Sequence, residues 1–212
     1  MPRPVAIHDD VIVEAARKVF LARGYRGSTM DVACLAGVSE GSIFKRFKTK
    51  ANLFLAAMDV ESREQSWQER LLAAAGTDDV RRTLVEYGRH LLERLQIITP
   101  RMLMVNASGI AFAKGYRFPE PPPPVQHIRR LARYFRSEIR CGRMAMASPE
   151  TQAHVFVGAL SHYVFCETVF HYRSAPPGVF VRTVAEMIVR VSQPAGKRVR
   201  CVRVEKKRRQ RS

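Results

Sequence analysis

The sequence predicts an all-α protein in which a small N-terminal helical domain precedes a larger helical bundle. Apolar residues recur at helical spacing along most of the chain, and no segment alternates strictly between apolar and polar residues over the length of a strand. Glycine and proline fall at joints between the periodic segments rather than within them. Hydrophobic residues make up 46% of the 212 residues, so the chain can bury a sizeable core.

The helices of the N-terminal part are predicted from their caps and breaks. Glycines end the first two helices, and side-chain caps begin the later ones, namely Ser28 or Thr29, Ser39 and Thr49. The pattern of the fourth helix extends to about Ala75. The predicted spans are about 9–23, 28–36, 39–47 and 49–75.

The remaining helices are predicted in the same way. Gly76-Thr77-Asp78 is a break with a new cap, Pro100 begins a separate helix, and the proline-rich stretch 118–124 is expected to be a stiff, extended connector. Ser148-Pro149-Glu150 is a strong helix start. The expected spans are about 78–98, 100–115, 125–140, 149–172 and 178–191.

The helix over 149–172 is expected to be buried on more than one side. Its stretch from Val155 to Phe170 is apolar nearly all round. One face can meet the core of its own domain while the other meets a second subunit.

The charge of the chain favours a polyanionic partner. The formal net charge is +17, of which the tail from Pro194 to Ser212 supplies +8. We expect this tail to be a disordered extension that adds salt-sensitive affinity for DNA.

Other classes of protein lack support in the sequence. No apolar run is long enough for a membrane span, and residues 1–10 lack the apolar stretch of a signal peptide, so we expect a cytoplasmic protein that does not bind membranes. The four cysteines are scattered, which argues against a metal site and against a disulfide framework. No catalytic motif is present, and neither enzyme activity nor a cofactor is expected.

Residues 28–50 carry the main functional pattern, a helix-turn-helix. Two short helices are separated by a turn at Gly37, with small residues where they must cross closely. Val38, Ile43 and Phe47 pack the second helix on the first, which leaves Glu40, Ser42, Lys45 and Arg46 on its outer face. A short helix with cations at its far end suits the major groove of DNA.

With these residues in view, the sequence resembles the TetR family of transcriptional repressors over about 11–58. The matching residues are Ile12-x-x-Ala15-Ala16, Phe20, Gly24-Tyr25, Ser28-Thr29, Val32-Ala33, Ala36-Gly37-Val38-Ser39-x-Gly41-Ser42-Ile43-Phe44-x-x-Phe47-x-x-Lys50 and Leu53-Phe54. The resemblance implies a homodimer on a pseudo-palindromic operator in double-stranded DNA, joined through about 149–172 and 178–191. It also implies a C-terminal domain whose small-molecule ligand changes the spacing of the two DNA-binding heads.

The resemblance also implies roles for individual residues. Ser28 or Thr29 is placed to bond a phosphate at a helix N-terminus, and Lys50 matches the family's phosphate-binding lysine. Phe44 replaces the usual tyrosine and loses its hydroxyl, whereas Glu40 either accepts a hydrogen bond from a cytosine amine or repels DNA. The candidate DNA-binding residues are Ser28, Thr29, Ser39, Glu40, Ser42, Phe44, Lys45, Arg46 and Lys50.

An effector pocket, if present, must lie within about 78–172. Methionine and aromatic residues are frequent there and would suit a small apolar effector, although such residues at helical spacing more often form core. The candidate lining residues are Tyr87, Met102, Phe112, Tyr116, Tyr134 and Phe165.

The expected organisation is a DNA-binding domain over 1–50, an effector-binding and dimerisation domain over 51–193, and the basic tail over 194–212. The helix from about residue 50 connects the two domains. Two rival hypotheses are a sequence-indifferent DNA-coating protein that depends on the tail, and a helical-bundle enzyme that carries a helix-turn-helix.

Overall fold

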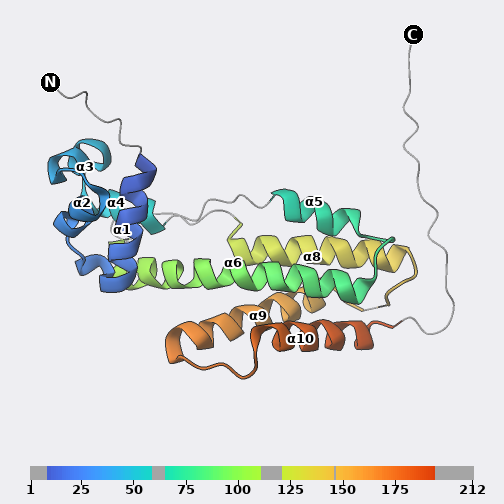
Figure 1. Ribbon diagram of the computed structural model, residues 1–212. Coiled ribbons are helices and arrows are strands. Elements are labelled where there is room, and N and C mark those ends of the chain that lie inside the picture. The colour runs from blue at the N-terminus through green and yellow to red at the C-terminus, as the bar shows by residue number, and fades with distance from the viewer. Residues whose placement is uncertain (1–8, 59–64, 111–120, 146, 194–212) are drawn as a thin grey trace, which may run out of the picture. The chain divides into compact units, whose positions relative to one another are not determined.

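The computed structural model describes residues 9–58, 65–110, 121–145 and 147–193, and these are helical as the sequence predicts (Figure 1). The chain forms two compact units. The first comprises residues 1–62 and 94–118, and the second comprises residues 63–93 and 119–212. The helix α6 (Val80–Ser108) therefore contributes its two halves to different units.

Side-chain caps set the start of each short helix in the first unit. Ser28 accepts a hydrogen bond from the Met30 amide at 3.1 Å, Ser39 accepts one from the Ser42 amide at 3.2 Å, and Thr49 accepts one from the Asn52 amide at 3.1 Å. Each cap was predicted. The helices are α1 (Asp9–Arg23), α2 (Thr29–Ala36), α3 (Glu40–Phe47) and α4 (Lys50–Met58), with a 3₁₀ turn η1 (Gly24–Arg26) after α1.

The core of the first unit is a small cluster in which aromatic rings meet edge to face. The ring of Phe54 lies 5.2 Å from those of Phe20 and Tyr25, between centroids. Val105, in the last part of α6, belongs to the same buried cluster. The short helices, which would be unstable alone, are thus held by one shared core. Its fully buried members are Ile12, Ala16, Phe20, Val32, Ile43, Leu53, Phe54 and Ala57.

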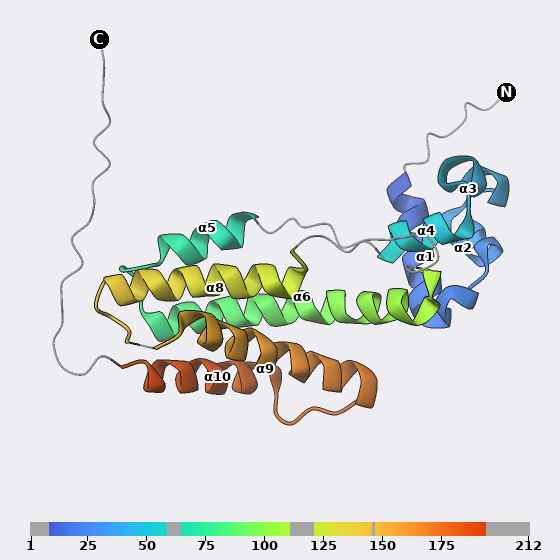
Figure 2. The same cartoon turned by 180° about the vertical axis from the view of Figure 1, so that it is seen from behind.

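The second unit is a helical bundle in which α8 and α9 make the most extensive contact (Figures 1 and 2). Gly88 of α6 allows a close helix approach, because a Cβ there would lie 2.7 Å from Val181 and 3.1 Å from Phe156. Its elements are α5 (Gln65–Ala73), residues 80–93 of α6, α8 (Pro123–Arg140), α9 (Pro149–Phe170) and α10 (Pro177–Val191).

Two predicted helix boundaries are wrong. The fourth helix does not run to Ala75 but ends at Met58, and α5 begins separately at Gln65. Pro100 does not begin a helix but lies inside α6, which continues to Ser108. Proline fits helical backbone angles and removes one hydrogen bond, to the carbonyl four residues earlier. That residue is Gln96, which is exposed.

The proline-rich connector is also shorter than predicted, because α8 already begins at Pro123. Proline is tolerated in a first helical turn, where its missing N–H would have had no helical partner. Residues 118–120 of that predicted connector lie outside the described residues.

The cysteines follow the expectation only in part. Cys34 and Cys166 are free, whereas Cys141 is disulfide-bonded. The spacing of cysteines along the sequence does not show which cysteines folding brings together, so it could not reveal the disulfide of Cys141.

Among the described residues, α9 alone is long and apolar enough to cross a membrane by length and composition. The core helix of a soluble protein passes the same test, so this is weak evidence for a membrane. Its residues Phe156, Leu160 and Val164 are fully buried, and α8 and α10 pack against it.

Candidate nucleic-acid interface

The turn between α2 and α3 is built as the sequence predicts. Gly37 has a φ of +68°, a conformation that glycine adopts without strain. The amides of Gly37 and Val38 donate to the carbonyls of Cys34 and Ala33 at 3.2 and 3.0 Å, which closes the end of α2. The chain thereby turns directly into the N-cap of α3, and the two helices cross at a fixed angle.

The two faces of α3 differ as expected. Ile43 is fully buried, whereas Phe44, Lys45 and Arg46 are exposed, Phe44 over 36% of its surface. The candidate recognition helix therefore presents one aromatic ring and two cations to solvent.

The two hydroxyls at the start of α2 have different environments. Ser28 is exposed, and its oxygen accepts from the Met30 amide, so its hydroxyl proton can be donated outward. Thr29 is only 8% exposed and donates to Glu40 Oε1 at 2.5 Å. Of the two alternatives, Ser28 is thus the residue whose hydroxyl is exposed to solvent.

The serines at the start of α3 bond each other. The hydroxyl oxygens of Ser39 and Ser42 lie 2.9 Å apart, and Ser39 also accepts from the Ser42 amide. Both were predicted as DNA contacts, and both retain this local role in capping α3.

The cations around α3 are held by neighbours that sequence reasoning missed. Arg46 Nε pairs with an Asp9 carboxylate oxygen of α1 at 3.2 Å. Lys50 Nζ lies 4.9 Å from the centre of the Tyr25 ring, a cation–π contact. Tyr25 itself was recognised only as part of the family motif.

Lys48 has a strained backbone at the end of α3. Its φ of 65° is in the left-handed region, which non-glycine residues rarely adopt. The Thr49 amide donates to the Phe47 carbonyl at 2.7 Å across it, so Lys48 is the centre of a γ-turn. This turn sets the direction in which the chain leaves the recognition helix and enters the cap of α4.

The predicted effector residues are dispersed. Tyr134 is fully buried, Phe165 is 36% exposed, and Met102 lies in the part of α6 that belongs to the first unit. Phe112 and Tyr116 lie outside the described residues. Only Tyr87, among the described members of this group, is found on the wall of the cavity described next.

The second unit contains a cavity of about 300 Å³ between α5 and the start of α6. Its lining combines buried apolar groups with exposed charged side chains. The Tyr87 hydroxyl is 2.9 Å from His127 Nδ1, which fixes the ring in the wall. The lining includes Arg70, Leu71, Ala74, Thr83, Glu86 and Tyr87.

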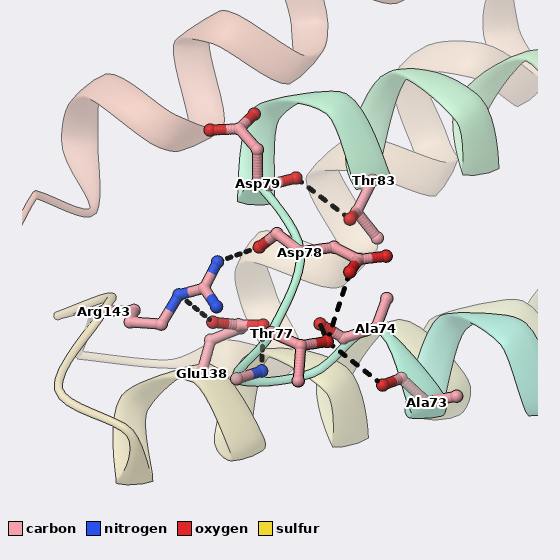
Figure 3. Close-up of polar contacts among 9 residues, drawn as sticks. Ala73, Ala74, Thr77, Asp78, Asp79, Thr83, Glu138 and Arg143 are labelled. Atoms are coloured by element: carbon pink, nitrogen blue, oxygen red, sulfur yellow. Dashed lines mark hydrogen bonds and ion pairs between the residues drawn. The ribbon is translucent and has the colours of Figure 1, made fainter. Parts of the chain in front are cut away.

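A buried carboxylate secures the turn beside this cavity (Figure 3). Glu138 is fully buried, accepts from the Gly76 amide at 3.0 Å and lies 3.1 Å from Arg143 Nε. Arg143 also donates to the Asp78 carbonyl. Burial and the nearby Glu138 charge raise the pKa of Tyr134. No sequence motif indicated this cluster, because its members come from segments more than 60 residues apart.

Comparisons with known proteins fit this geometry. Residues 12–57 match the family model of bacterial regulatory proteins of the TetR family. Residues 82–193, more than half of the chain, match the model of the C-terminal domain of AefR-like transcriptional repressors.

Two relatives match part of the chain. The HTH-type transcriptional regulator QacR of Staphylococcus aureus is 37% identical over 62 residues, which are 29% of this chain and 32% of QacR. The HTH-type transcriptional repressor BepR of Brucella suis is 35% identical over 71 residues, 33% of this chain and 32% of BepR. The matches thus span about a third of each relative's length.

Solved structures share the fold at low sequence identity. A TetR-family regulator from Mesorhizobium loti has a TM-score of 0.66 at 18% identity, covering 91% of this chain and 100% of that one. SmeT, the repressor of a Stenotrophomonas maltophilia multidrug efflux pump, has a TM-score of 0.60 at 16% identity, covering 90% and 93%. A regulator from Saccharomonospora viridis in complex with choline has a TM-score of 0.60 at 16% identity, covering 88% and 97%.

Proposed function

Because the chain belongs to the TetR family of bacterial transcriptional regulators, we propose that it represses transcription as a ligand-responsive homodimer. The observation that carries the proposal is the exposed face of α3, with Phe44, Lys45 and Arg46 outward and Lys50 following at the start of α4. Each subunit places α3 in a major groove, where side chains can read base edges.

The operator follows from the symmetry of the dimer. Two identical heads read a pseudo-palindrome whose half-site centres lie about one helical turn, ~34–36 Å, or a multiple of it apart. The dimer bound at its operator blocks RNA polymerase. Because a bacterial regulator of this kind acts where the DNA is, the cytoplasm is the expected location. We further propose that residues 1–50 read DNA and that residues 51–193 bind the effector and form the dimer.

Selection of bound sequences from a random duplex pool tests DNA reading. The full-length protein is used at ~150 mM salt, where weak non-specific binding is reduced. An enriched inverted repeat is the expected result. Binding without enrichment, lost on a modest increase in salt, would contradict the proposal and support a sequence-indifferent coating protein.

The exposed apolar side chains of α9 and α10 support homodimerisation. Phe170 is 64% exposed, Met187 61% and Val191 68%. Large exposed apolar patches are uncommon on soluble monomers and mark interaction sites. Figure 2 shows the two helices side by side in the second unit. A second copy packed on this surface would remove these side chains from solvent.

The cavity beside Tyr87 supports an effector site. A small, mainly apolar molecule would bury itself on Leu71, Ala74 and Tyr87. Release from DNA then follows by population shift, because the ligand binds more tightly to the conformation whose heads do not match the operator.

A thermal-shift screen with hydrophobic compounds tests this site. At least one compound should stabilise the protein, and Ala74→Leu, which fills the cavity, should abolish that shift while operator binding persists. Ala75→Leu is the matched control, since Ala75 is adjacent. Equal shifts in both variants would place the effector elsewhere, and a screen without any stabilising compound would count against an apolar effector.

A further inference from the structure

The contact between Thr29 and Glu40 joins the starts of α2 and α3. Thr29 Oγ1 donates to Glu40 Oε1 at 2.5 Å, the length of a charge-assisted hydrogen bond to a carboxylate. Thr29 is only 8% exposed, so the residues packed around it restrict the movement of its side chain. The Glu40 carboxylate, half-buried on the first residue of the recognition helix, is therefore held in one orientation.

The second carboxylate oxygen, Oε2, remains available for an external donor. Within the described part of the chain it receives no hydrogen bond, and the neighbouring hydroxyls of Ser39 and Ser42 bond each other. Gly41 follows without a side chain, and a Cβ placed there would meet only Ser39 Oγ within 4 Å, at 3.9 Å. The first turn of α3 thus combines an oriented acceptor with a bare position where DNA can approach closely.

An ionised carboxylate only accepts hydrogen bonds, and this limits the bases it can read. In the major groove, guanine presents N7 and O6 acceptors and thymine an O4 acceptor, and all of these repel it. Adenine offers a donor beside the N7 acceptor, so the contact is partly repulsive. Cytosine offers its N4 amino group alone and is the matching base.

We propose that Glu40 selects cytosine at one position of each operator half-site and that Thr29 is its positioning residue. This inference rests on the proposed function. The carboxylate lowers affinity for every other base through repulsion, whereas the cations Lys45, Arg46 and Lys50 on the same surface supply attraction to phosphates. Specificity and affinity are thereby assigned to different residues of one head.

Sequence selection with Glu40→Gln is the first test. The wild-type protein should enrich cytosine at one position of each half-site, with a preference over thymine of about 5-fold or more, the discrimination of one good base contact. Glutamine pairs with adenine, so the variant should enrich adenine at that position and leave the others unchanged. An unchanged base at every position would overturn the proposal, whereas no enrichment by the wild-type protein would overturn the proposed function itself.

Variants of Thr29 test the positioning role. Thr29→Val has the same shape without the hydroxyl and should reduce the preference for cytosine several-fold. Thr29→Ser retains the hydroxyl and should restore it. A duplex carrying 2-pyrimidinone, which lacks the amino group, in place of the selected cytosine should bind wild-type protein and Thr29→Val with equal affinity. A serine variant as unselective as the valine variant, with both folded by circular dichroism, would refute positioning by the hydroxyl.

Discussion

Lys50 illustrates how a single residue depends on a neighbour that is distant in sequence. Its ammonium group lies over the Tyr25 ring, 25 residues earlier in the chain, and Tyr25 is anchored in turn against Phe54. The sequence predicted the lysine but not its support, because a cation–π contact has no spacing rule. The same is true of Thr29 and Glu40, whereas the caps at Ser28, Ser39 and Thr49 act within three residues and could be read directly.

We predict that Lys50→Ala weakens binding to all duplexes alike and lowers the slope of log K against log salt by about one unit. Tyr25→Leu should have a smaller effect, about 0.5–1 kcal/mol, since it removes the ring face but retains the charge. Fluorescence anisotropy titrations over a range of salt concentrations measure both. Tyr25→Phe, which retains a ring face, is the control, and a reduction in affinity equal to that of Tyr25→Leu would exclude the cation–π contact.

Lys48 allows a prediction about stability. A non-glycine residue in the left-handed region costs roughly 1–2 kcal/mol, and glycine there loses about 0.5–1 kcal/mol through backbone entropy. Lys48→Gly should therefore raise the free energy of unfolding by up to about 1 kcal/mol. Lys48→Ala keeps the strain and should not. Urea unfolding distinguishes them, and a glycine variant less stable than the alanine variant would show that the turn is unstrained.

Tyr134 should make the protein sensitive to alkaline pH. Burial and the Glu138 charge raise the pKa of its hydroxyl in the folded state, so folding favours the protonated form. The resulting stability is complete below the unfolded pKa of about 10 and is lost as pH rises above it. Between neutral pH and a pH just above that value, the urea midpoint of Tyr134→Phe should therefore fall less than that of the wild-type protein. An identical pH dependence in both proteins would assign the effect to another group.

At the scale of whole helices, the sequence predicted those helix boundaries that depend on local capping chemistry. It did not predict the boundaries that depend on tertiary packing. The starts of α2, α3 and α9 follow from serine caps. The path of α6 through Pro100 does not, because burial of its residues on both sides of the proline outweighs one missing backbone hydrogen bond. The start of α8 at Pro123 was predicted too late for a related reason. The first N–H groups of a helix have no partner within the helix, so proline there removes no hydrogen bond.

The pairing of α9 with α10 yields a prediction about assembly. One chain has a mass of 24.1 kDa, and light scattering should give about twice this value. Met187→Glu, on the exposed apolar surface of α10, should produce monomers and weaken operator binding. Val11→Glu places the same change at an exposed position of α1 and should leave the mass unaltered. Dimers in both variants would move the interface away from α10.

For the whole molecule, the distribution of charge distinguishes the hypothesis of a sequence-specific regulator from that of a sequence-indifferent coating protein. Residues 194–212 carry +8 of the net +17. Basic residues that neutralise phosphates add affinity that is independent of base sequence and falls steeply with salt. The side chains proposed to read bases, in contrast, belong to α3, which packs on the core of the first unit through Ile43, and none of them belongs to the tail.

Deletion of residues 194–212 should therefore lower affinity for every duplex but retain preference for the selected operator. Each phosphate that the protein no longer neutralises reduces the salt slope by about 0.9 units, so the slope should become shallower by several units if the tail lies along DNA. Anisotropy titrations with the operator and with a scrambled duplex, between ~50 and ~200 mM salt, measure both quantities. If the ratio of the two affinities instead falls to one on deletion, specificity does not come from the α3 surface, and the basic tail governs binding.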